Sequence, residues 1–219
     1  MKAKLLMIQG TSSGSGKSTL VVALCRIFSN LGYKVCPFKA QNMTSNFHVV
    51  KQKGLVRRMA GIQSVQATAA RIEPDTRMNP VLLKPLGENT SEIILGGIGN
   101  LKMTAEDYYK TFVLQKGLPK VLKDLNSLRN ENDLIIIEGA GSPAEINLSD
   151  YDIANMILAE RTKSDVLLIA DIERGGCFAA IVGTMRLLPP RQRKFVKGIL
   201  INKFLGQKSI LNDAIVQVE

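Results

Sequence analysis

Residues 10–19 read GTSSGSGKST, and this stretch decides what kind of fold the chain can adopt. The apolar run at 5–8 before it is typical of a short buried strand, and the apolar run at 20–28 after it is typical of a helix. A phosphate-binding loop needs this order of strand, glycine-rich turn and helix. Glycines let backbone N–H groups converge on an anion, and the helix N-terminus adds partial positive charge. The sequence therefore predicts a nucleotide-binding loop.

Within this loop, Lys17 is expected to contact the β- and γ-phosphates of a nucleotide, and the Ser18 hydroxyl to ligate Mg²⁺. The spacing between Gly10 and Gly16 is one residue longer than in the usual motif, which is typical of the dethiobiotin-synthetase branch of P-loop enzymes. A nicotinamide-binding GxGxxG is excluded, because Thr19 stands where a glycine is required. The loop residues predicted to bind the nucleotide are Gly10, Thr11, Ser13, Gly14, Gly16, Lys17, Ser18 and Thr19.

The composition places further limits on the class of protein. A length of 219 residues predicts one large domain, or at most two small ones, and no apolar run approaches the ~20 residues of a membrane helix. The first apolar stretch stops at Ile8, which is too short for a signal peptide, so we expect a cytoplasmic protein. Cys25, Cys36 and Cys177 have no metal-site spacing and are expected to be buried free thiols.

The formal net charge is +10, which raises the question of a polyanionic partner. The basic residues are mostly scattered and tryptophan is absent, so we expect a solvated surface or attraction for small polyanions such as ATP or a polycarboxylate, rather than nucleic acid. The two local basic groups are Lys51, Lys53, Arg57 and Arg58, and Arg191, Arg193, Lys194 and Lys197.

Polar residues stand where several predicted strands end. Lys39 follows the strand at 34–38, and Glu138 ends the strongly apolar strand at 133–138. Ligands of parallel α/β sheets lie outside the carboxyl ends of the strands, so both side chains are expected near the loop. Glu138 is expected to reach the metal, and Lys39 to contact the transferred phosphoryl group and its acceptor. The alternation of strands and helices predicts an α/β, P-loop NTPase-like fold with one mostly parallel sheet and helices on both faces.

The remaining elements are predicted from periodicity and turn residues. We expect helices at 55–72, at 104–129 with Pro119 kinking or splitting it, at 152–161 and from about 177 to 187. Strands are expected at 80–84, at 165–170 and at 197–203, and a hairpin over 91–101 at the edge of the sheet. The polar segment at 142–150 is expected to be a substrate loop.

Several segments together resemble the ATP-binding synthetase domain of the cobyric acid synthase family, which is dethiobiotin-synthetase-like. They are GTSSGSGKSTL, PFKAQNM, MNPVLLKP, IEGAGSPAEINL, DIANM, DIERGG and INKF, and they run from residue 1 to about 204. The resemblance implies ATP- and Mg²⁺-dependent amidation of corrin side-chain carboxylates through an acyl phosphate. It implies catalytic roles for Lys17, Lys39 and Glu138, and places Asn202 and Lys203 at the adenine. The residues it implies on the corrinoid side are Gln41, Asn42, Glu145, Asn147, Asp171 and Arg174.

The sequence also departs from this family. Full-length members carry a glutaminase domain, and here His48 is the sole histidine and no cysteine stands in a Gly-x-Cys-x-Gly elbow. We therefore expect residues 1–219 to form a single synthetase domain. Either it is a fragment of a longer protein, or it receives ammonia from a separate glutaminase domain or subunit, or from solution. A homodimer is compatible with the resemblance. The family also has Arg-Ala-Gln where residues 61–63 read Gly-Ile-Gln, and Arg-Gly-Asp where residues 205–207 read Leu-Gly-Gln.

Two alternative functions stay open at this stage. A MinD- or ParA-like regulatory ATPase shares the fold, although such proteins carry an extra lysine where Ser12 stands. The other alternative is an inactive remnant of a synthetase that binds ATP without turnover.

Overall fold

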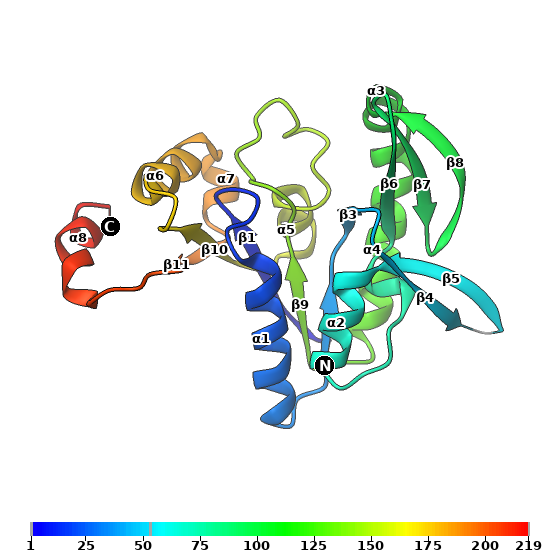
Figure 1. The fold of residues 1–219 in the computed structure, drawn as a ribbon, viewed down its shortest axis with the longest axis horizontal. Coiled ribbons are helices and arrows are strands. Elements are labelled where there is room, and N and C mark those ends of the chain that lie inside the picture. Colours follow the sequence, from blue (N-terminus) through cyan, green and yellow to red (C-terminus); the bar gives the residue numbers. More distant parts are fainter. Residues whose placement is uncertain (1, 53, 219) are drawn as a thin grey trace.

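The computed structural model describes residues 2–52 and 54–218, so Lys53 of the first basic group lies outside the described residues. Its centre is a five-stranded sheet in the order β11-β10-β1-β9-β2, and every pairing in it is parallel. The strands are β1 (Lys4–Gly10), β2 (Val35–Phe38), β9 (Leu134–Glu138), β10 (Asp165–Asp171) and β11 (Val196–Asn202). Because the strands are parallel, all five carboxyl ends lie at one edge, next to the glycine-rich loop (Figure 1).

Helices cover both faces of this sheet, as predicted. On one face, α1 (Lys17–Asn30) packs Val21 and Cys25 against Ile8 and Ile136, with the end of α2 (Gly61–Ala69) beside it. The opposite face is covered by α4 (Leu118–Arg129) and α5 (Met156–Thr162). The central strands are apolar on both faces because both faces of the sheet are buried. Each fully buried aliphatic side chain contributes roughly 1.5–3 kcal/mol to the free energy of folding. The predicted α/β fold is confirmed.

A second, four-stranded sheet stands beside the first. It contains β3 (Gln41–Met43), β6 (Val81–Gly87), β7 (Thr90–Leu95) and β8 (Ile98–Thr104), in the order β3-β6-β7-β8. The predicted hairpin is therefore present as β7 and β8, but its expected place at the edge of the parallel sheet is wrong. The chain leaves the parallel sheet after β2, and the amide of Val81 then donates to the Ala40 carbonyl, so β6 extends from β3 instead.

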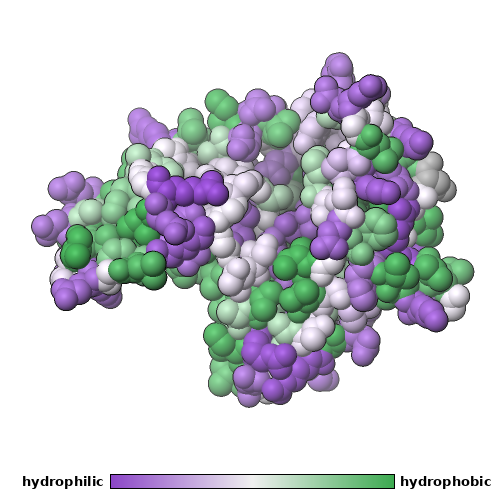
Figure 2. All heavy atoms as spheres, viewed as in Figure 1, coloured by the Kyte–Doolittle hydropathy of each residue, from purple (hydrophilic) through white to green (hydrophobic). Residues whose placement is uncertain are grey.

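The predicted helix at 55–72 is wrong in its first third. Residues Leu55–Ala60 form β5, which pairs antiparallel with β4 (Phe47–Gln52), and α2 begins only at Gly61. Gly54 lies in the connecting turn with a φ of 74°, a conformation that favours glycine over other residues. β-Branched valines on both strands favour the extended conformation. The tip of the hairpin exposes Val49, Leu55 and Val56, and apolar side chains gather there on the surface (Figure 2).

The long helical stretch begins as predicted, at a cap made by Thr104, whose side chain accepts from the amide of Asp107. Three segments follow one another without interruption: α3 (Ala105–Asp107), the π-helix η2 (Tyr108–Gly117) and α4. The change from η2 to α4 falls directly before Pro119. This proline lies in the first turn of α4, where a missing amide N–H costs little, because the helix changes its hydrogen-bonding register there.

The remaining elements are short or follow the predictions closely. α6 (Cys177–Leu187) follows β10, whereas α5 begins at Met156 and not at 152, because Asp152 accepts from the Ala154 amide and from the Asn155 side chain and so holds 152–155 in a turn. The short helices are η1 (Thr76–Met78), α7 (Pro190–Arg193), η3 (Lys208–Leu211) and α8 (Asn212–Val218). The three cysteines are buried and free. Across residues 2–52 and 54–218, no helix is both long and apolar enough to cross a membrane.

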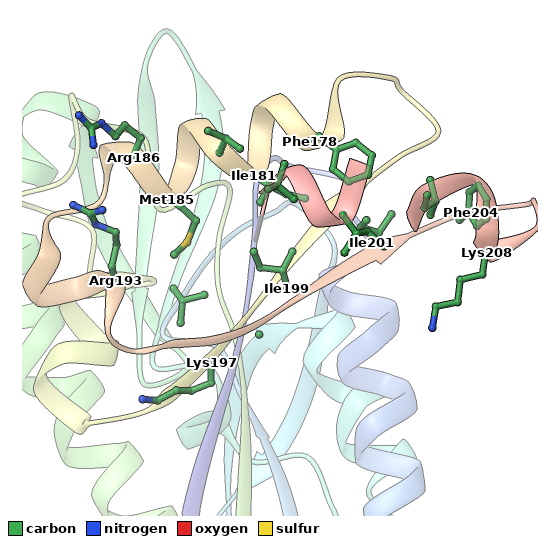
Figure 3. A pocket seen from close by; sticks show the side chains of 16 residues that line it. Phe178, Ile181, Met185, Arg186, Arg193, Lys197, Ile199, Ile201, Phe204 and Lys208 are labelled. Atoms are coloured by element: carbon green, nitrogen blue, oxygen red, sulfur yellow. The ribbon is translucent and has the colours of Figure 1, made fainter. Parts of the chain in front are cut away.

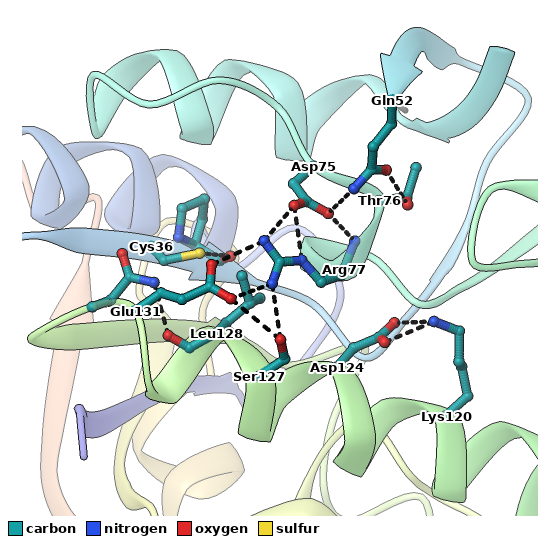
Figure 4. A network of polar contacts seen from close by, with 12 residues as sticks. Cys36, Gln52, Asp75, Thr76, Arg77, Lys120, Asp124, Ser127, Leu128 and Glu131 are labelled. Carbon is teal, nitrogen blue, oxygen red and sulfur yellow. Dashed lines mark hydrogen bonds and ion pairs between the residues drawn. The ribbon is translucent and has the colours of Figure 1, made fainter. Parts of the chain in front are cut away.

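A network of charged side chains joins η1 to the end of α4 (Figure 4). Arg77 contacts both Asp75 and Glu131, and donates to the Ser127 hydroxyl at 2.9 Å. Burial tends to raise the pKa of Asp75, but hydrogen bonds from Arg77 outweigh it and lower that pKa. The hydrogen bond from Arg77 likewise lowers the pKa of Glu131. The network therefore fixes the segment that leads into β6.

Arg77→Ala is expected to lower the free energy of unfolding by about 1–2 kcal/mol at neutral pH, because it removes several charge-assisted hydrogen bonds. Both carboxyl pKa values are lowered by folding, so their stabilising effect is present above the unfolded values near 4 and is lost as pH falls below them. Urea unfolding at several pH values measures this difference. The loss should shrink in acid, and exposed Lys123→Ala on α4 should change stability by less than about 0.5 kcal/mol. A constant loss at every pH would contradict the assignment.

Candidate active site

The glycine-rich loop between β1 and α1 is tightly built around its glycines. Gly14 and Gly16 have φ angles of 74° and 103°, in the left-handed region that favours glycine. A Cβ on Gly10 would lie 2.3 Å from the Ser15 hydroxyl oxygen, and one on Gly16 would lie 2.1 Å from Asn202 Nδ2. A side chain at these positions would therefore displace Ser15 or Asn202 or strain the backbone, and the glycines keep the backbone accessible to an anion.

Lys17 lies at the start of α1 with its ammonium group inside the loop. Its Nζ donates to the carbonyls of Ser12 and Gly141, each at 2.9 Å. Burial and the nearby Lys39 lower the pKa of Lys17 to about 8, against the opposing effect of Glu138. A buried ammonium that is held by carbonyls alone remains poorly compensated, so a phosphate next to it would be strongly favoured.

Glu138, at the end of β9, is the centre of the polar contacts beside the loop. Its Oε1 accepts from the Ser18 hydroxyl at 2.8 Å and from Lys39 Nζ at 2.6 Å. Its Oε2 accepts from the amide of Gln66, on α2. Only 1% of the Glu138 side chain is exposed, so this carboxylate depends on its partners for solvation. The expected meeting of Ser18, Lys39 and Glu138 at the strand ends is present in the structure.

The residues of this site fit a nucleotide phosphate and Mg²⁺. The Ser15 hydroxyl is buried in the loop and has no hydrogen-bond partner among the described residues, as expected of a group that would bind an anion. Ser18 and Glu138 offer two adjacent oxygen ligands, which Mg²⁺ prefers. Within the described ranges, no three His, Cys, Asp or Glu side chains gather as a metal-binding group, so phosphate oxygens and water would complete the coordination.

A second group of predicted residues lies at the ends of β10 and β11. Lys203 Nζ and Arg174 Nε lie 2.7 and 3.5 Å from Asp171 Oδ2. Asn202 Nδ2 donates to the Ser15 carbonyl at 2.9 Å, which ties β11 to the loop. Arg174 is largely exposed and extends over the loop, since a Cβ on Gly14 would lie 3.2 Å from its guanidinium. These four side chains therefore border the opposite side of the loop from Glu138.

The residues predicted on the acceptor side are only partly brought together. Gln41 and Glu145 line one cavity of about 180 Å³, which reaches Gly141 next to Lys17. Asn42 is buried and donates to Gln63 at 3.0 Å. Asn147 is exposed on the loop between β9 and α5 and does not line that cavity. In Figure 1 this loop rises beside the glycine-rich loop. Asp171 and Arg174 lie instead with Asn202 and Lys203, at the ends of β10 and β11.

Two buried contacts of the site were missed from the sequence. Gln66 binds Glu138, and Asn155 binds Ala140 in both directions, accepting from its amide at 3.2 Å and donating to its carbonyl at 2.6 Å. A Cβ on Gly139 would lie 2.3 Å from Asn155 Oδ1, so the Gly-Ala-Gly turn is shaped to receive this side chain. The only signal was the glutamine pair at 63 and 66, whose spacing places both on one helix face.

A larger cavity, of about 850 Å³, lies away from these residues (Figure 3). It is an apolar groove between α6, β11 and the terminal helices, with Phe178, Ile181 and Ile201 in its wall. None of the residues predicted for catalysis or binding lines it, so its size does not mark the reactive centre.

Comparison with known proteins identifies the family of this chain. Residues 6–219 match the family described as CobQ/CobB/MinD/ParA nucleotide binding domain. The chain is 51% identical over 217 residues to a cobyric acid synthase of Dehalococcoides mccartyi, covering 99% of this chain and 42% of that protein. It is 49% identical over 219 residues to a probable cobyric acid synthase of Methanothermobacter thermautotrophicus, covering 100% and 43%. The chain thus spans less than half the length of these relatives.

The fold is also similar to that of a solved structure. The signal recognition particle receptor FtsY from Elizabethkingia anophelis, in complex with GDP, matches with a TM-score of 0.53 and 14% identity over 92% of this chain and 49% of that one. At this identity the likeness concerns the fold alone. The resemblance to cobyric acid synthases that the sequence motifs predicted is confirmed, and the chain belongs to the CobQ/CobB/MinD/ParA family of nucleotide-binding domains.

Proposed function

We propose that this chain is the synthetase part of a cobyric acid synthase, which uses ATP and Mg²⁺ to amidate side-chain carboxylates of a corrin. The observation that supports this most directly is the meeting of Ser18 and Lys39 on Glu138, next to the buried Lys17. Phosphoryl transfer needs positioned cations and a metal site more than it needs acid–base groups. The name of the relatives, cobyric acid synthase, is the basis for proposing a corrin carboxylate as the substrate.

In the proposed reaction, a corrin carboxylate oxygen attacks the γ-phosphorus of ATP, and the bond to ADP breaks. Ammonia then attacks the acyl carbon of the acyl phosphate, releasing inorganic phosphate and leaving the amide. Lys17 would hold the β- and γ-phosphates, and Ser18 and Glu138 would ligate Mg²⁺. In the structure Lys39 is paired with Glu138. In the reaction it would bridge the acceptor carboxylate and the transferred phosphoryl group. Asn202 and Lys203 would lie at the adenine.

The acceptor would approach from the side of Gln41 and Glu145, which line the cavity beside Gly141. Asn42, Asn147, Asp171 and Arg174 are proposed to contribute to the corrinoid side. The net charge of +10 also favours a polycarboxylate substrate, because it attracts anions from any direction. Ammonia would come from a separate glutaminase domain or subunit, or from solution.

The test is to incubate the protein with ATP, Mg²⁺, ammonium and cobyrinic acid a,c-diamide, and to follow the corrinoid by mass spectrometry. We expect successive replacements of a hydroxyl by an amino group with ammonium, and none with glutamine alone. Nucleotide binding without amidation would contradict the proposal and favour an inactive remnant. ATP hydrolysis that is insensitive to the corrinoid would instead favour a regulatory ATPase.

A further inference from the structure

Three buried amide side chains form a directed chain of hydrogen bonds that ends on Glu138. Asn42 Nδ2 donates to Gln63 Oε1 at 3.0 Å, and Gln63 Nε2 donates to Gln66 Oε1 at 3.5 Å. Gln66 Nε2 then donates to Glu138 Oε2. Both glutamines are fully buried, and Asn42 is 9% exposed. Water therefore has little access to replace any of these contacts.

The carboxylate fixes the direction of the whole chain. An ionised carboxylate only accepts hydrogen bonds, so Gln66 must present its NH₂ group to Glu138 and its oxygen to Gln63. Gln63 must then donate to Gln66 and accept from Asn42. The orientation of Gln66 thus fixes that of Gln63, which is also on α2, and Gln63 in turn fixes the orientation of Asn42 on β3. When every amide in such a series of hydrogen bonds has its partners, each side chain is held in one orientation.

We infer that Gln66 is a positioning residue for Glu138, and that Gln63 and Asn42 lock the orientation in which Gln66 donates. By holding Oε2, Gln66 keeps Oε1 directed at Ser18 and Lys39. Without this donor, a buried carboxylate oxygen is left unpaired, and the carboxylate turns away from Ser18 to find another partner. This inference rests on the proposed role of Glu138 as a metal ligand.

Gln66→Met tests the inference, because methionine keeps the length of the side chain and removes the N–H donor. Calorimetry with ADP, with and without Mg²⁺, measures how much the metal strengthens nucleotide binding. We expect the strengthening by Mg²⁺ to fall by about 10-fold, as for other residues that orient a metal ligand, while metal-free affinity changes less than about twofold. Thermal unfolding with and without ADP reports whether the variant is folded.

Gln52→Met is a matched control. It removes the same kind of contact, from Gln52 Nε2 to a carboxylate oxygen of Asp75 at 2.9 Å, at a place away from the site. It should leave the effect of Mg²⁺ unchanged. In corrinoid turnover, Gln66→Met should raise the Mg²⁺ concentration required for half-maximal rate more than it lowers kcat, a split that general loss of structure would not give.

A second variant keeps the test decisive if Gln66→Met does not fold. Gln63→Met leaves Gln66 in place but removes the contact that fixes its orientation. We expect it to reduce the strengthening of nucleotide binding by Mg²⁺, but by less than Gln66→Met does. The inference is overturned if folded variants at positions 63 and 66 both keep the full effect of Mg²⁺. If Mg²⁺ has no effect on nucleotide binding or turnover in the unaltered protein, the proposed metal role of Glu138 fails first.

Discussion

Lys17→Ala is expected to lower the affinity for ATP by at least about 100-fold, because it removes charge-assisted hydrogen bonds to two phosphates, worth about 3 kcal/mol together. Isothermal calorimetry with a non-hydrolysable ATP analogue measures the change. The same titration with Lys116→Ala, which removes an exposed lysine from η2, should give unaltered affinity.

The Lys17 variant should nevertheless fold. Burial and the nearby Lys39 lower the pKa of Lys17, so in the absence of a phosphate the folded state carries this charge at a cost that two hydrogen bonds to carbonyls and the nearby Glu138 offset only in part. We therefore expect thermal stability without nucleotide to be retained or raised. A variant that binds the analogue as tightly as the unaltered protein would refute the assignment of the loop.

Glu138→Gln is expected to lower the Mg²⁺-dependent rate of amidation by about 10³-fold, since positioned charge at a phosphoryl-transfer site supplies effects of this size. Metal-free nucleotide binding should be unchanged or stronger, because a buried negative charge that faces the phosphates is removed. Paired measurements of turnover and of metal-free ADP affinity separate the two effects.

Glu106→Gln, at an exposed position of α3, provides the matched control, and neither measurement should change. An equal loss of turnover and of metal-free nucleotide affinity in Glu138→Gln would count against a metal role and indicate general damage to the loop. A full rate with Mg²⁺ would contradict the role outright.

The placement of the main site residues was predictable because it follows from parallel strands. Gly10, Glu138, Asp171 and Asn202 each end a strand of the parallel sheet, and Lys39 follows another, so strand boundaries alone bring them to one edge. The apolar run before Glu138 identified its strand without any knowledge of the neighbours. Such strands are nearly all apolar when both faces are buried, which makes them conspicuous.

The parts that were not predicted depend on contacts between distant segments. Residues 55–60 have apolar residues at spacings that fit a helix as well as a strand, and only the pairing with β4 decides between them. Once 55–60 are a strand, α2 begins at Gly61 and turns Gln66 toward Glu138 at the end of β9. No local pattern indicates that a glutamine will meet a carboxylate 72 residues away.

The double hydrogen bond between Asn155 and Ala140 closes the base of the segment that leads from β9 to α5. At the apex of that segment, residues 145–150 are exposed except for the half-buried Leu148. Insertions, deletions or grafts at the apex should consequently leave the glycine-rich loop and Glu138 in place. Under the proposed function, changes in these six residues would alter one part of the acceptor side, around Glu145 and Asn147, without altering the residues that hold the phosphates.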